Sequence, residues 1–212
     1  MDLLENGTIY CSPISTFANH SDGGRYDKDE LVTKMVNMEG EIMEISPLDQ
    51  PDKKSYIRVQ TGHYKEVINN PTGNLYCMFT LELEEAPVGH VFELEEKMAE
   101  EFGEYFVFIQ NSREFTKRVA EELNKRRIKY SDKRVKYSDF TKLSGDKDLF
   151  MKDELYAYQK EYRLFLDTGL NEAYKLKIGS IKEIASIHRS DPSIRWIKMN
   201  SSNVVNTNMH KF

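Results

Sequence analysis

The chain has 212 residues, of which 39% are apolar and 31% are charged, enough for one large domain with a real core and a well-solvated surface. A formal net charge of −5 excludes a general attraction of the whole chain to nucleic acid or to anionic membranes. The opening residues, MDLLENG, lack the basic start and apolar run of a signal peptide, and no segment has a membrane-spanning apolar length. We therefore expect a cytoplasmic protein without a membrane partner.

The N-terminal half is predicted to mix one longer helix with several strands. The helix at 28–40 is predicted because Leu31, Met35 and Met38 lie on one helical face. The segment 75–83, LYCMFTLEL, has the central, aromatic-rich apolar run that is typical of a strand. In chain order, the predictions are a helical turn 2–6, strand 8–15, loop 15–27, helix 28–40, strands 41–45, 55–60 and 64–68, turn 69–74 and strand 75–83.

The C-terminal half contains the clearest helix, at 111–127, where Asn111 followed by Glu114 is an N-terminal capping pattern. The nearly all-apolar segment 104–109 is predicted to be a central strand buried on both faces. In chain order, the predictions are helix 92–103, strand 104–109, helix 111–127, two short strands around a polar turn in 128–140, helix 148–159, strand 160–167, strand or turn material at 173–179, 184–190 and 194–199, and a polar tail at 201–212.

Strands outnumber helices in this pattern, and the two do not alternate strictly. The sequence therefore predicts an α+β fold: a single domain over 1–200 with a mixed, twisted sheet and helices packed on it, followed by the tail 201–212. The two cysteines, Cys11 and Cys77, each lie in an apolar, strand-like run, and we expect buried free thiols.

Metal and phosphate motifs are absent from the sequence. The five histidines do not fall at a metal-binding spacing, and there is no phosphate-binding loop of the Gly-x-x-x-x-Gly-Lys-Ser/Thr type. The acidic residues near Asp27 and Asp29 lack the ligand spacing of a calcium loop, and we interpret them as a solvated helix N-terminus. We predict no metal site.

The strongest charge feature is the segment 125–142, KRRIKYSDKRVKYSDFTK, which holds eight Lys or Arg against two Asp. This local charge of +6, with tyrosines and a phenylalanine between the cations, could hold a phosphate backbone and stack bases, or hold an acidic protein surface. It could also be a helix end followed by a hairpin whose outward positions are basic. The candidate partner-binding residues are Arg126, Arg127, Lys129, Tyr130, Lys133, Arg134, Lys136 and Tyr137.

The stretch ELYAYQKEYRLFLD, 154–167, contains a Gln-x-Glu at the start of a predicted strand. This resembles the motif of ADP-ribosyltransferases, and the resemblance implies an enzyme with Glu161 as its catalytic carboxylate and NAD as its cofactor, or a nucleotide-binding protein of the same shape. Gln159, Ser15 and Arg25 would then lie near Glu161. A fixed carboxylate in a dry pocket would stabilise the positive charge that develops on the ribose. The alternative is an ion pair of Glu161 with a Lys or Arg across the sheet.

Segments across most of the chain together resemble a family of uncharacterised bacterial and phage proteins. They include LLENGTIYCSPISTFAN, GGRYDKDE, NLYCMFTLE, VKYSD, LFMKDELYAYQKEYRLFL and LKIGSIKEIASIH. The family pattern R-x-D-x-x-E falls here on Arg25, Asp27 and Glu30. Its later pattern, K-x-x-x-Y-x-x-Q/E-x-E-x-R, falls on Lys152, Tyr156, Gln159, Glu161 and Arg163.

The resemblance implies an accessory protein encoded by a phage or prophage that acts in counter-defence or host modulation by binding a protein or another anionic macromolecule. Under this reading no cofactor is expected, and NAD belongs to the enzyme alternative alone. If Arg25, Asp27, Glu30, Glu161 and Arg163 converge, they must neutralise one another to be buried. They would form either a closed structural network or an open ligand site, and the sequence favours the closed form.

Overall fold

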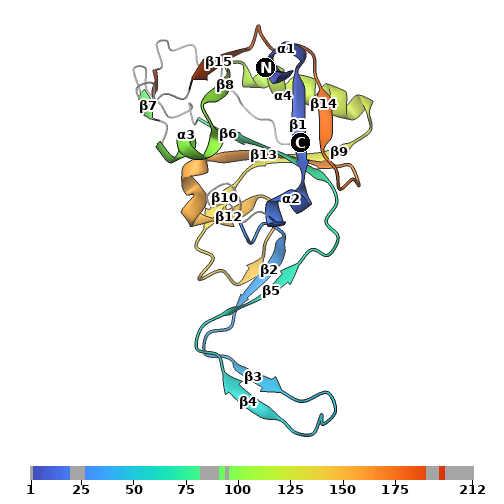
Figure 1. Ribbon diagram of the computed structural model, residues 1–212, viewed down its shortest axis with the longest axis vertical. Coiled ribbons are helices and arrows are strands. Elements are labelled where there is room, and N and C mark those ends of the chain that lie inside the picture. Colours follow the sequence, from blue (N-terminus) through green and yellow to red (C-terminus); the bar gives the residue numbers. More distant parts are fainter. Residues whose placement is uncertain (1, 20–26, 82–90, 94–95, 190–195, 199–212) are drawn as a thin grey trace.

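The centre of the computed structural model is a five-stranded antiparallel sheet (Figure 1). Its strands, in spatial order, are β14 (Tyr174–Lys177), β1 (Thr8–Pro13), β6 (Asn74–Phe79), β13 (Glu161–Asp167) and β9 (Lys129–Arg134). The structure describes residues 2–19, 27–81, 91–93, 96–189 and 196–198. Many strands and few helices make this a mixed α+β arrangement, which confirms the predicted fold class. The predicted tail 201–212 lies outside the described residues.

One face of the sheet carries the main hydrophobic core. The helix α4 (Ser112–Lys125) lies on this face, and the Asn111 side chain caps it by accepting a hydrogen bond from the Glu114 amide at 3.0 Å, as predicted. The helix α1 (Asp2–Asn6) and the strand pair β8 (Tyr105–Ile109) and β15 (Ala185–Arg189) complete the layer. The buried residues of this core are Ile9, Cys11, Phe115, Val119, Leu123, Leu164, Leu166, Leu176, Ile181, Ile184 and Ala185.

The opposite face of the sheet is where the charged residues gather. Side chains alternate along a strand, so the burial of Leu164 and Leu166 in the main core directs Arg163 and Phe165 of β13 to the other side. A second, smaller core covers part of that side, where the helix α2 (Ile14–Asn19) packs Ile14 against the sheet. The predicted loop 15–27 therefore begins inside a helix; of the rest, 20–26 lies outside the described residues and Asp27 is buried.

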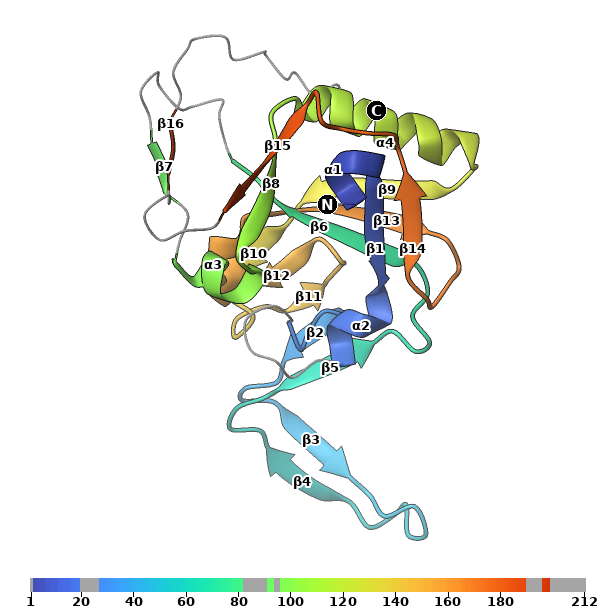
Figure 2. The same cartoon turned by 45° about the horizontal axis from the view of Figure 1, so that its top comes forward.

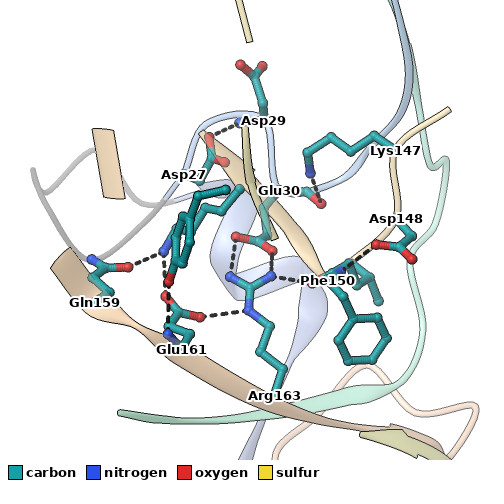
Figure 3. A network of polar contacts seen from close by, with 12 residues as sticks. Asp27, Asp29, Glu30, Lys147, Asp148, Phe150, Gln159, Glu161 and Arg163 are labelled. Carbon is teal, nitrogen blue, oxygen red and sulfur yellow. Dashed lines mark hydrogen bonds and ion pairs between the residues drawn. The ribbon is translucent and has the colours of Figure 1, made fainter. Parts of the chain in front are cut away.

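Segments from 136 to 160 build the layer above the charged face. The strand β10 (Lys136–Ser138) pairs in parallel with β12 (Met151–Asp153), which leads directly into a 3-10 helix, η1 (Glu154–Gln159). The helix η1 ends at Lys160, which adopts the left-handed conformation with φ 39°, and β13 begins at the next residue. This sharp turn places Gln159 and Glu161 on the same side of the chain, facing β12 (Figure 3).

A long two-stranded ribbon leaves the body at the end opposite α4 (Figures 1 and 2). Its base is the three-stranded sheet of β11 (Gly145–Asp146), β2 (Val32–Asn37) and β5 (His63–Val67). Its outer part pairs β3 (Ile42–Ile45) with β4 (Ser55–Arg58), and every residue of these two strands is exposed. The other described elements are α3 (Glu96–Phe102) and the strand pair β7 (Val91–Glu93) and β16 (Trp196–Lys198).

The helix predicted over 28–40 is wrong, because this segment contains the strand β2. A register shift between Val32 and Lys34 interrupts the pairing with β5, so that Val32 and Met35 both point inward. The bulge separates two buried residues by three positions, which is the spacing of a helical face rather than of a regular strand. The prediction rested on Leu31, Met35 and Met38, but Leu31 and Met38 lie just outside the strand, and Leu31 packs in a different core cluster from Met35.

Three further predictions also need correction. The two strands in 128–140 do not form a hairpin, because β9 pairs with β13 whereas β10 pairs with β12, and the buried Val135 between them donates its amide to the Glu161 carbonyl. The strand β8 pairs with β15 and none of its residues is buried, so in the described part of the chain it is not a central strand. The helix predicted over 148–159 is β12 followed by η1.

Candidate functional site: a buried charge network and a basic sheet edge

The Arg163 guanidinium lies at the centre of a buried charge network (Figure 3). It grips the Glu30 carboxylate with two nitrogens, Nη1 on Oε1 and Nη2 on Oε2, the latter at 3.1 Å. Its Nε donates to Glu161 Oε2 at 2.7 Å, and Nη1 also donates to the Leu149 carbonyl. Arg163 and Glu30 are each 1% exposed, so a residue early in the chain is tied to a late strand inside the protein.

Lys152 closes the network from the side of β12. Its ammonium donates to Glu161 Oε1 at 2.7 Å and to Gln159 Oε1 at 2.5 Å, and it lies 4.7 Å from the centre of the Tyr156 ring. Both carboxylate oxygens of Glu161 therefore hold a cation. The Tyr137 hydroxyl accepts the backbone amide of Glu161 at 2.9 Å, which fixes the start of β13. Two cations and two carboxylates balance within this set, as burial requires.

The electrostatics keep this set ionised. Burial raises the pKa of Glu161, but the neighbouring Arg163 and Lys152 outweigh it and bring the pKa below its ordinary value. Burial lowers the pKa of Arg163, and the Glu30 and Glu161 carboxylates more than reverse that effect. Burial also lowers the pKa of Lys147, which packs beside the network and whose ammonium lies 3.5 Å from the Glu30 carbonyl.

The turn 27–30 carries two more carboxylates beside the network. Asp27 Oδ1 accepts the Asp29 amide at 2.9 Å, and the Asp29 carboxylate accepts from the Lys65 ammonium at 2.5 Å. Asp27 and Asp29 are 2% and 7% exposed, so the interpretation of these residues as a solvated helix N-terminus is wrong. They fold a turn against the body and fix the position from which Glu30 reaches Arg163.

The structure brings together Glu30, Gln159, Glu161 and Arg163 of the predicted site residues, with Asp27 in the adjoining turn (Figure 3). Arg25 lies outside the described residues. The Ser15 hydroxyl donates to the Asn171 side chain at 2.5 Å. The prediction of site residues missed Lys147 and Lys65 and did not include Lys152, although Lys152 and Tyr156 both stand in the family pattern and touch each other here.

The contacts favour the closed, structural form of the network. Both Glu161 oxygens are occupied, the Arg163 guanidinium is engaged by two carboxylates and a carbonyl, and the open pocket described below lies elsewhere. One buried atom of the turn, Asp27 Oδ2, has no hydrogen-bond partner among the described residues. The arrangement fits a structural ion-pair network that joins distant segments of the chain better than a site prepared for a reacting molecule.

The basic segment 125–142 lies mainly on β9, which is the outermost strand of its sheet in the described part of the chain. Its candidate cations are exposed: Arg126, Arg127, Lys129, Lys133, Arg134 and Lys136. Its aromatic residues point inward. Tyr130 is half-buried against the main core, Tyr137 holds the Glu161 amide, and Phe140 is 4% exposed.

An open pocket of about 660 Å³ lies where α4 ends and β9 begins. Its apolar walls come from Ile128, Tyr130 and Phe165, and its charged rim includes two cations, Arg127 and Lys129, and one carboxylate, Asp167. Asn124 and Ser131 complete its lining. We call the exposed cations of 126–136 and this pocket the basic face.

Comparison with protein-family models, curated proteins and solved structures found no match for this chain. The resemblances drawn from the sequence therefore stay predictions. Within the described residues, no helix combines the length and apolar character needed to cross a bilayer, and no cluster of three or more His, Cys, Asp or Glu residues could hold a metal ion. Cys11 and Cys77 are both free, with Cys11 buried and Cys77 half-buried.

Proposed function

We propose that this protein works by binding an acidic segment of a macromolecular partner along its basic face. The observation that carries the proposal is the row of exposed cations on and beside β9, at the outer edge of the central sheet. The rest of the chain has a net charge of −11, so this face is a local positive surface on an acidic molecule. It attracts anionic groups that the molecule as a whole repels.

The outer edge of β9 also suits an extended ligand. A strand at the edge of a sheet has backbone donors and acceptors that another strand can pair with, and peptide recognition by strand addition uses them. Lysines on such an edge often act only to prevent aggregation. Here the pocket at the start of β9 places an apolar recess next to the cations. Protection against aggregation does not require such a recess.

The partner is more compatible with a protein than with a nucleic acid. Single-stranded nucleic acids are held by aromatic side chains on which bases stack. Tyr137 and Phe140 of the basic segment instead serve the interior, and Tyr130 presents only part of its ring. An acidic peptide needs cations, a strand edge and an apolar recess, and the basic face offers all three.

The enzyme alternative would require Glu161 to face a bound NAD. In this structure its carboxylate is engaged on both oxygens by Lys152 and Arg163. The geometry therefore favours binding over catalysis, and NAD remains tied to the alternative. Calorimetric titration with NAD tests this alternative directly. Heat of binding to the wild type that is absent from a folded Glu161→Ala variant would support the enzyme and contradict a purely structural role for Glu161.

The biological setting that we propose is the one implied by the family resemblance: a cytoplasmic accessory protein of a phage or prophage, acting in counter-defence or host modulation. An acidic host surface is the partner chemistry that fits the basic face.

The test uses a fluorescently labelled peptide of alternating Glu and apolar residues, and an oligonucleotide of equal charge, in anisotropy titrations. We expect the peptide to bind, with an affinity that falls as salt is raised, and Lys129→Glu with Lys133→Glu to abolish binding. Lys175→Glu with Lys177→Glu is the matched control, because these exposed lysines lie on β14 at the opposite edge of the same sheet. Equal loss in both double variants, or preference for the oligonucleotide, would contradict the proposal.

A further inference from the structure

The outer part of the ribbon, residues 41–59, is an arm that projects into solvent (Figures 1 and 2). It continues the β2–β5 pairing, because the Met38 amide donates to the Gly62 carbonyl and the Val59 amide to the Glu41 carbonyl, each at 2.9 Å. None of its residues belongs to a hydrophobic core of the described structure. Two-stranded ribbons are marginally stable when nothing covers them.

Both faces of the arm are rich in exposed apolar side chains. Cross-strand pairing places Met43 and Ile57 on one face, where they are 44% and 53% exposed. On the other face, Ile42 and Tyr56 are 59% and 65% exposed. Leu48, in the turn at the tip, is completely exposed. An apolar group of this size on one projecting element marks an interaction surface.

We propose that a second copy of this chain covers the arm: two copies exchange arms, and Leu48 of each enters the pocket at the start of β9 in the other. This inference rests on the proposed function, because it assigns the basic face to the arm of a second copy of the chain. The apolar walls of the pocket, Ile128, Tyr130 and Phe165, receive the leucine.

The charges of the two surfaces are complementary. The arm, residues 41–59, has four carboxylates and three cations, a net charge of −1, whereas 125–142 carries +6. Asp49 directly follows Leu48 at the tip, and Arg127 and Lys129 lie at the rim of the pocket. Lys54, later in the same turn, is paired with Glu44 of the arm. Opposite charges around an apolar anchor orient a contact and exclude partners of the wrong sign.

The shape of the molecule allows the exchange to close. The arm and α4, whose end borders the pocket, lie at opposite ends of the molecule, so an arm cannot reach the pocket of its own chain (Figures 1 and 2). A two-fold axis perpendicular to the long axis inverts one copy against the other and brings each arm tip to the α4 end of its partner. Both contacts form at once, which gives a closed dimer rather than a chain of molecules.

The size of the contact is adequate for a stable dimer. Stable interfaces involve about 20–30 residues and about 800 Å² on each partner. The 19 residues of the arm, 41–59, and the eight that line the pocket are within this range on each copy.

Analytical ultracentrifugation of the full chain over a concentration series tests the inference. We expect a dimer that weakens with salt, and a dissociation constant raised about 100-fold by Leu48→Ser, since each of two symmetric contacts loses about ten-fold. Leu155→Ser is the matched control: this leucine is 77% exposed on η1, away from the arm, and its loss should leave the dimer unchanged.

Mixing two different variants tests the exchange itself. Leu48→Ser keeps an intact basic face, and Lys129→Glu with Lys133→Glu keeps an intact arm. At a concentration between the dissociation constants of the wild type and of Leu48→Ser, each variant is expected to be monomeric alone, but the mixture should form a dimer through its one complete contact. The exchange is overturned if the wild type stays monomeric at every concentration. It is also overturned if the dissociation constant of the dimer is unchanged by the two lysine substitutions.

These results are separable from those of the proposed function. Binding of the acidic peptide by the Leu48→Ser variant measures the basic face without the arm. Peptide binding by a chain that never dimerises would keep the proposed function and remove the exchange. A dimer insensitive to the lysine changes, together with no peptide binding, would remove both.

Discussion

At the scale of single residues, Arg163 shows how a polar group becomes part of the interior. An unpaired guanidinium inside a protein is very unfavourable, and here two carboxylates and a carbonyl surround it. The pairing joins residues 133 positions apart, so the network links the turn at Glu30 to β13. Its contribution is specificity of arrangement: a different register of β13 would leave charges buried without partners.

Replacement of Arg163 by Met is expected to lower the free energy of unfolding by about 3–5 kcal/mol, because Glu30 and Glu161 would remain buried without their shared cation. Equilibrium urea unfolding measures the change. Arg189→Met is the control, because Arg189 and its partner Glu104 are each 59% exposed, and surface pairs contribute little. Equal, small effects of both substitutions would show that the network does not stabilise the fold.

The depressed pKa of Glu161 predicts a loss of stability in acid. Because Arg163 and Lys152 outweigh burial and lower the pKa of Glu161 in the folded state, the unfolded chain takes up a proton first, at about its ordinary value of 4.5. The stabilisation is complete above that pH and is lost as the pH falls through the folded pKa. Glu161→Gln cannot titrate, so its free energy of unfolding should change less than that of the wild type below pH 4.5. Parallel pH profiles for both proteins would contradict this.

At the scale of elements, regular patterns were predictable and irregular ones were not. The helix α4 and the strands β1, β6 and β13 were predicted, because a capping pair and uninterrupted apolar periodicity identify them. The strand β2 was mistaken for a helix, because Leu31, Met35 and Met38 are spaced like a helical face, although Leu31 and Met35 pack in different core clusters. The parallel pairing of β10 with β12 leaves no local signal, since each strand has only three residues and the paired residues are 15 positions apart.

The same division applies to the candidate site. Glu161, Gln159 and Arg163 were predicted because they stand in one short motif, and Glu30 through a family pattern. Lys147 and Lys65 resemble ordinary surface lysines in the sequence. Their positions beside the network follow from the packing of β11, β2 and β5, which single-sequence patterns do not encode.

The turn between α1 and β1 gives a prediction at this scale. Gly7 has φ +61°, and a Cβ added there would lie 1.7 Å from the Gly179 carbonyl oxygen. Gly7→Ala must therefore separate the start of β1 from the turn after β14, and we expect a loss of more than about 3 kcal/mol in thermal unfolding. Gly40→Ala, with φ +82° and no atom within 4 Å of the added Cβ, isolates the backbone strain and should cost about 1–2 kcal/mol. Similar losses in both variants would argue against the close approach.

At the scale of the whole molecule, the body and the arm differ in how much of their apolar surface is buried. The body buries its apolar residues on both sides of one sheet, whereas the arm exposes Ile42, Met43, Tyr56 and Ile57 on a ribbon with no core. Exposed apolar surface is not required for the fold of the body. It lies in a position where a second molecule can cover it, which separates the folding unit from the proposed contact element.

That separation predicts that the body folds without the arm. Glu41 and Val59 already pair, so replacing 42–58 with Asn-Gly should close the ribbon with a two-residue turn. We expect the free energy of unfolding at low protein concentration to change by less than about 1 kcal/mol, because no buried residue is removed. Leu166→Ala, at a site that is 0% exposed, provides the contrast and should cost about 2–5 kcal/mol.

Raising the protein concentration should then increase the melting temperature of the full chain but not of the armless variant, since a dimer is stabilised by mass action. An armless chain that is unfolded, or that gains the same concentration dependence, would show that the arm belongs to the folding unit and not to the contact between copies.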